Sequence, residues 1–99
     1  MQAFYAAKFD REMGCTEAEW LRWLPQAVGH PRWKLSSQSA EIYIGDGVLN
    51  LNWEIASPRL IGLICMPVLK VQFRFERLEL VDREAFMRRF DLYMQRGGG

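Results

Sequence analysis

Residues 69–77 have the sequence Leu-Lys-Val-Gln-Phe-Arg-Phe-Glu-Arg, in which apolar and polar side chains alternate without interruption. A period of two residues is the pattern of a β-strand with one buried and one solvated face. At about 3.4 Å per residue the stretch spans roughly 30 Å, about the width of a small domain. We therefore expect a central strand, with Phe73 in its middle on the buried face.

Shorter segments of the same kind precede this strand. Residues 33–36, 40–44 and 48–55 alternate and predict three strands, and Gly45-Asp46-Gly47 suits a hairpin turn between the last two. Ser57 and Pro58 predict the next turn. Residues 60–66 then predict a separate strand that ends at Pro67. Short connections of this kind favour a meander of neighbouring antiparallel strands.

Two helices are predicted on either side of these strands. Thr16 and Glu19 form a capping box that starts the first helix, and Pro25 should kink or end it. Asp82 is the expected cap of the second helix. The apolar face of that helix consists of Phe86, Met87, Phe90, Tyr93 and Met94. Residues 97–99 are all glycine and predict a frayed tail, whereas residues 1–14 suit a short helix, an edge strand or a disordered arm.

These elements predict a single α+β domain over residues 1–99. We expect a two-layer sandwich in which an antiparallel meander of four or five strands carries the N-terminal and the C-terminal helix on one face. The alternative is a partly open β-barrel or roll that holds the C-terminal helix. The number of predicted strands is low for a barrel.

The composition excludes several classes of protein. Nearly half of the residues are apolar, which excludes intrinsic disorder, and the net charge of +1 gives no general attraction to nucleic acid or membrane surfaces. The sequence contains no apolar run of about 20 residues and no signal-peptide pattern. The two cysteines do not suggest a disulfide framework. We therefore expect a cytoplasmic protein without membrane association.

Few residues suggest catalysis or metal binding. Cys15 lies at a helix start, where the thiol pKa is often lowered, but His30, the one histidine, is expected at the far end of that helix. A buried apolar role for Cys15 is the simpler interpretation, and Cys65 is expected in the core. The spacing of His and Cys suits no zinc site. We expect no enzyme activity, no metal and no cofactor.

The solvated face of the sheet offers a candidate interaction surface. Residues 60–66 are apolar at every position, so one set of large side chains must emerge on this face, either Leu60, Ile64 and Met66 or Ile61, Leu63 and Cys65. The alternative is that residues 1–14 fold over this strand. The predicted surface consists of Leu60, Ile64, Met66, Tyr43 and Arg74.

Two other groups of residues suggest binding sites. Trp23, Trp33 and Trp53 could line an aromatic pocket between the first helix and the sheet. A candidate basic patch on the back of the second helix consists of Arg88, Arg89, Leu92 and Arg96.

These patterns favour a non-catalytic protein-interaction module, whose partner is another protein or a second copy of the chain bound through the sheet. A small-molecule-binding domain with the aromatic pocket is the first alternative. Weak nucleic-acid binding, through Lys70, Arg74 and Tyr43 or through the helix arginines, ranks last because the charge is balanced.

Overall fold

The computed structural model describes residues 5–96, and the predicted frayed tail at residues 97–99 lies outside this part, as do residues 1–4. The described elements are β1 (Lys8–Met13), α1 (Glu17–Val28), β2 (Trp33–Leu35), β3 (Ser39–Ile44), β4 (Gly47–Ile61), β5 (Ile64–Glu76) and α2 (Leu80–Arg96). The predicted α+β class is confirmed.

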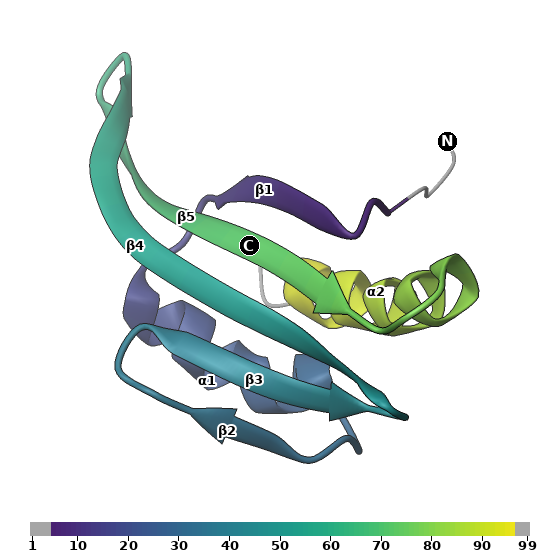
Figure 1. The fold of residues 1–99 in the computed structure, drawn as a ribbon. Coiled ribbons are helices and arrows are strands. Elements are labelled where there is room, and N and C mark those ends of the chain that lie inside the picture. The colour runs from purple at the N-terminus through teal and green to yellow at the C-terminus, as the bar shows by residue number, and fades with distance from the viewer. Residues whose placement is uncertain (1–4, 97–99) are drawn as a thin grey trace.

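The five strands form one open antiparallel sheet in the order β1-β5-β4-β3-β2 (Figure 1). Strands β2 to β5 follow one another as the expected meander, and β1 adds an edge strand beside β5. Of the three structures that suited residues 1–14, the described part of this segment forms the edge strand, over Lys8–Met13. Because β1 and β2 lie at opposite edges, the sheet does not close, and the barrel alternative is wrong.

Strand β5 is the central strand that its alternating sequence predicts. It pairs with β1 through residues 69–74 on one side and with β4 over most of its length on the other. Phe73 lies opposite Phe9 and Leu51 and is buried. Its ring stacks on Phe9 at 4.6 Å and meets the Phe90 ring edge-on at 5.6 Å.

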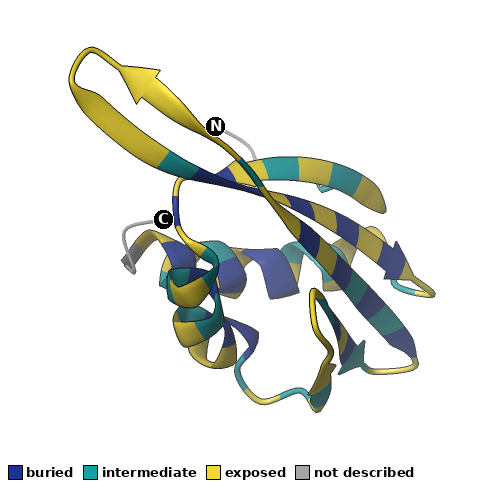
Figure 2. Ribbon diagram, turned by 90° about the vertical axis from the view of Figure 1, so that its left-hand side faces the viewer, coloured by how far each residue is buried: buried dark blue, intermediate teal, exposed yellow. Residues whose placement is uncertain are grey.

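Both helices pack on one face of the sheet (Figures 1 and 2). The capping box of α1 is present, since the Glu19 backbone N–H donates to Thr16 Oγ1 at 3.1 Å and the Thr16 N–H donates to Glu19 Oε1 at 3.0 Å. The helix does not end near Pro25 but continues to Val28. Burial of Ala27 and Val28, together with a hydrogen bond from the Gly29 N–H to the Pro25 carbonyl, fixes the last turn.

Helix α2 begins at Leu80, two residues before the expected cap. The backbone N–H groups of Asp82 and Arg83 both donate to the Glu79 carbonyl at 3.0 Å. Asp82 therefore lies in the first turn, where a carboxylate is favoured by the positive end of the helix dipole. The predicted apolar face of α2 is confirmed, because Phe86, Met87, Phe90 and Met94 are buried and Tyr93 is half-buried.

The connection between β4 and β5 differs from the prediction. Ser57 and Pro58 do not form a turn, and Pro67 does not end a strand. Instead β4 continues to Ile61, and the turn falls at Gly62 and Leu63, where Gly62 has a φ of 61°. The register shifts between Ala56 and Arg59, so Ser57 and Pro58 together face Pro67 in a β-bulge. Bulges tolerate proline, which explains why both prolines lie inside the hairpin.

The β4–β5 hairpin is too long for the helices to cover. A strand of 15 residues such as β4 spans about 50 Å, whereas the 17 residues of α2 span only about 25 Å. The distal part of the hairpin consequently projects beyond both helices, and nearly all of it is exposed (Figure 2). We refer to residues 55–66 as the hairpin arm.

Candidate functional site

The hairpin arm concentrates the exposed apolar side chains of the described chain. Six of them have exposed fractions between 38% and 105%: Ile55, Leu60, Ile61, Leu63, Ile64 and Met66. The same alternating β4 and β5 sequences bury their apolar residues wherever α1 and α2 lie beneath them. Exposure of these six residues therefore follows from the length of the hairpin.

The turn at Gly62 divides the apolar residues between two faces of the arm. Cross-strand partners share a face, and the pairs are Leu60 with Cys65, Ile61 with Ile64, and Arg59 with Met66. The expectation of a single strand presenting either Leu60, Ile64 and Met66 or Ile61, Leu63 and Cys65 was therefore wrong. Cys65, which we expected in the core, is exposed. Both faces of the arm are apolar.

The base of the arm is fixed to the end of β1. Arg59 donates to Glu12 Oε1 at 2.7 Å, and a Cβ atom placed on Gly14 would lie 3.5 Å from Met66 Sδ. The described N-terminal residues run along residues 69–75 of β5 rather than over the arm. Residues 5–14 therefore contact the arm only at its base. Within the described residues, they do not fold over the apolar segment as the alternative predicted.

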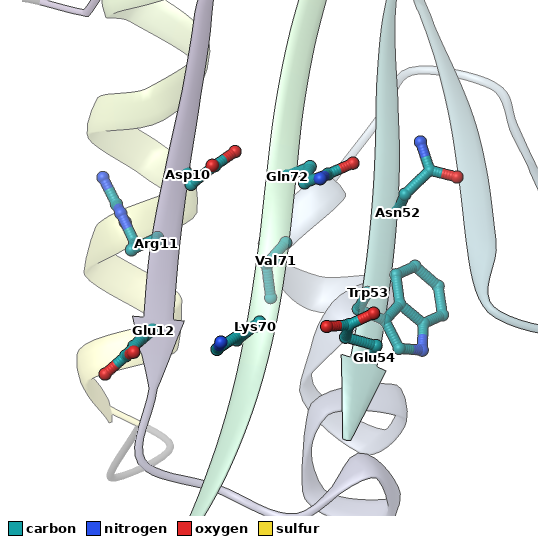
Figure 3. Close-up of a pocket in the computed structure, with 9 residues that line it drawn as sticks. All are labelled: Asp10, Arg11, Glu12, Asn52, Trp53, Glu54, Lys70, Val71 and Gln72. Carbon is teal, nitrogen blue, oxygen red and sulfur yellow. The ribbon is translucent and has the colours of Figure 1, made fainter. Parts of the chain in front are cut away.

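The open face of the sheet is polar in the part next to the base of the arm (Figure 3). Two cross-strand rows lie in a depression of about 360 Å³. They are Asp10–Gln72–Asn52 and Glu12–Lys70–Glu54. The first row contains one carboxylate and two amides, and the second contains two carboxylates and one lysine, so the depression is polar and net negative. A polar surface is usual for the solvated face of an antiparallel sheet.

Tyr43 and Arg74 lie on the sheet away from the arm. Arg74 pairs with Lys8 and Asn50, about 26 Å along β5 from Met66 at ~3.3 Å per residue. Tyr43 lies on β3 and donates its hydroxyl to Glu41 Oε1 at 2.6 Å. The predicted interaction surface is therefore divided, with its three aliphatic members in the arm and its two polar members elsewhere.

Three ionisable side chains of the described residues have raised pKa values. Within residues 5–96, no three His, Cys, Asp or Glu side chains are grouped so as to hold a metal ion. Burial raises the pKa of the Cys15 thiol to about 11, the opposite of the lowering that a helix start can cause. Burial and a hydrogen bond to Asp91 raise the pKa of Tyr5, and the hydrogen bond to Glu41 raises the pKa of Tyr43.

The three tryptophans of the predicted pocket do not line a common depression. Trp53 is buried, donates its Nε1–H to Glu17 Oε2 at 2.9 Å, and forms part of the wall of the polar depression. Trp33 lines a second depression with Arg32, Lys34 and Tyr43 at the β2 edge. Trp23 packs half-buried against the core and lines neither depression.

The predicted basic patch on α2 is only partly free. Arg89 donates to the Gln26 carbonyl at 3.1 Å, so it caps the C-terminus of α1, and it lies 4.5 Å from the Tyr93 ring centroid. Arg88 and Leu92 are exposed. The side chain of Arg96 lies outside the described residues.

The sequence interpretation placed Ile55 on the buried face, and it treated Ile61 and Leu63 as an alternative to Leu60, Ile64 and Met66 rather than as part of the same exposed arm. The signal that could have found them is Gly62, a glycine at the first position of a two-residue turn between two pairs of large apolar residues. Ser57 followed by Pro58 is also typical of turns, and the turn was therefore predicted there instead of at Gly62.

Comparisons with known proteins identify no relative. No protein-family model, no curated protein and no solved structure matches this chain. Within the described residues, neither helix is long and apolar enough to cross a membrane.

Proposed function

We propose that this protein is a small, non-catalytic protein-interaction module that docks through its hairpin arm. The observation that carries this proposal is the contrast along the β4–β5 hairpin. Its proximal part buries every large apolar side chain that faces the helices, whereas the arm leaves six exposed on a ribbon that the helices do not reach. An exposed apolar patch of this size is typical of protein contact surfaces.

The remaining surface supports this proposal by its contrast with the arm. The depression on the open face is lined mainly by charges and amides, whereas small-molecule pockets are mostly apolar. Lys70 lies between Glu12 and Glu54, which weakens any attraction to phosphates. Both cysteines are free thiols, which supports a location in the reducing cytoplasm.

Site-specific photo-crosslinking tests the proposal. We would place benzoyl-phenylalanine at Leu63, which is fully exposed at the tip of the arm, and at Arg74 on the open sheet face as the control. The expected result is a discrete cross-linked adduct, of defined mass, between this chain and one partner protein. It should form from position 63 and be absent from position 74. Equal adduct patterns at the two positions, or no adduct at position 63, would contradict docking through the arm.

A further inference from the structure

We propose that the occupant of the hairpin arm is a second copy of this chain, so that two arms pair around a two-fold axis. This inference rests on the proposed function, because it identifies the partner of the same surface. Three properties of the arm support it: its exposed area, its lack of charge and its free strand edges.

The exposed area matches what one partner contributes to a stable dimer. The six exposed aliphatic residues together present roughly 700–800 Å², close to the ~800 Å² per partner of an interface of standard size. Because the arm is a thin ribbon with two apolar faces, a flat partner surface would cover only one of them. A second arm that crosses or wraps around the first can cover both.

The charge distribution favours self-pairing over an oppositely charged partner. Among residues 55–69, Arg59 is the only ionisable side chain apart from the Cys65 thiol, and Arg59 is already bonded to Glu12 of its own chain. A two-fold interface places a patch against itself, so any net charge would repel its own copy. The arm beyond Arg59 carries no charged side chain, and it therefore offers no charge that an oppositely charged partner could recognise.

The strand edges of the arm are also unpaired in the described structure. Strand β1 stops opposite Leu69, and the pairing of β3 with β4 stops at Asn52. Pro58 and Pro67 lack a backbone N–H and blunt the edges near the base, but residues 59–66 contain no proline. Open edges without protecting charges pair readily with another strand, and identical antiparallel edges satisfy two-fold symmetry.

Sedimentation of the purified full chain tests the inference. We expect a reversible dimer at micromolar concentration, and Leu60→Lys should raise its dissociation constant by about tenfold or more, because it removes apolar contact and places like charges together. Leu92→Lys is the matched control, since Leu92 is an exposed leucine on α2 far along the chain from the arm. It should leave the dissociation constant unchanged. Circular dichroism checks that both variants remain folded.

The native Cys65 thiol provides a second, independent readout. Cys65 is exposed in the arm whereas Cys15 is buried, so a short bis-maleimide should join two chains through Cys65 and give no covalent dimer with Cys65→Ser. A chain that stays monomeric at ~100 μM, a dimer that Leu60→Lys leaves intact, or a dimer that Cys65 cannot cross-link would each overturn self-pairing. A monomer that binds lipid vesicles through the arm would also overturn self-pairing. A monomer that still gives a discrete adduct with another protein from position 63 would refute self-pairing and leave the proposed function standing.

Discussion

At the scale of single residues, the helix-facing side of β1 shows how this small domain accommodates a charge against its core. Arg11 extends toward α2, where its guanidinium bonds Asp91 Oδ1 at 2.5 Å and lies 5.3 Å from the centre of the Phe73 ring. Tyr5 donates its hydroxyl to the other oxygen of the same carboxylate at 2.6 Å. Because both groups of the ion pair are hydrogen-bonded and only partly buried, β1 is joined to α2 without an isolated charge.

The first prediction concerns Phe73 and its neighbour Arg74. Phe73 is held between Phe9 and Phe90 in a strand paired on both sides, so truncation to Ala leaves a cavity that cannot readily close. We expect Phe73→Ala to lower the free energy of unfolding by ~3–5 kcal/mol in urea melts. Arg74→Ala removes an exposed side chain from the open face and should change it by no more than ~0.5 kcal/mol. A comparable loss for Arg74→Ala would mean that the open face is covered.

The second prediction concerns the Cys15 thiol. Its pKa is raised from 9.0 to about 11 by burial, so the folded state retains the proton over a range in which the unfolded state loses it. The contribution of Cys15 to stability is therefore present at neutral pH and is lost as the pH rises from 9 toward 11. Urea melts across this range measure the free energy of unfolding of the wild type and of Cys15→Ala. The difference between the two should become smaller as the pH rises. A constant difference would contradict the raised pKa.

At the scale of elements, the C-terminus of α1 depends on a residue from α2. Helix α1 has no basic residue in its last turn, and Arg89 of α2 supplies the missing donor to the Gln26 carbonyl. A Cβ atom on Gly29 would lie 2.5 Å from Arg89 Nε, so the absence of a side chain at Gly29 makes room for the guanidinium. The two helices are thereby joined at their surface as well as through the core.

The third prediction compares Arg89 with its neighbour Arg88. We expect Arg89→Ala to lower the free energy of unfolding by about 1 kcal/mol, because it leaves a helix-terminal carbonyl without its donor. Arg88→Ala removes an equal charge from an exposed position and should cost less than ~0.5 kcal/mol. Thermal melts of the two variants under identical conditions measure the difference. Equal losses would mean that charge on this helix, rather than the cap, determines stability.

The elements also show how far the sequence can predict the fold. The alternation around Phe73 and the capping box at Thr16 depend on local chemistry, and each predicts its element because the surrounding structure agrees with it. Local chemistry offered two positions for the turn after β4, one at Ser57 and Pro58 and one at Gly62, and did not decide between them. Ser57 and Pro58 suit a turn, and only the pairing of β4 with β5 past Pro67 converts them into a bulge.

The candidate site was predictable to a similar extent. The unbroken apolar run at residues 60–66 indicated an exposed surface, but its geometry depends on where the helices end, which no pattern within the run encodes. The lengths of the strands and helices determine how much of the hairpin is exposed, because each residue advances about twice as far in a strand as in a helix. Tyr43 and Arg74 were grouped with the arm because alternation predicts only which face a residue occupies, not how far along the strand it lies.

At the scale of the whole molecule, the arm makes the domain elongated, with principal extents of 46 × 33 × 21 Å. A compact two-layer body holds the core, and the two-stranded ribbon extends from it (Figure 2). Isolated two-stranded ribbons are marginally stable in water. The body and the arm should therefore differ in local stability even though β4 and β5 run through both.

The last prediction measures that difference by hydrogen exchange. In dilute solution the backbone amides of residues 59–66 should exchange much faster than those of residues 69–75, which β1 and β4 flank on both sides. If arms pair, raising the protein concentration should slow exchange in residues 59–66 by about tenfold or more and leave residues 69–75 unchanged, since association stabilises only the segment it orders. Leu60→Lys should abolish the concentration dependence while preserving the fast exchange. An arm as protected as the core at every concentration would mean that the ribbon is rigid by itself, and its exposed aliphatic residues would then present a preformed surface rather than a segment ordered by its partner.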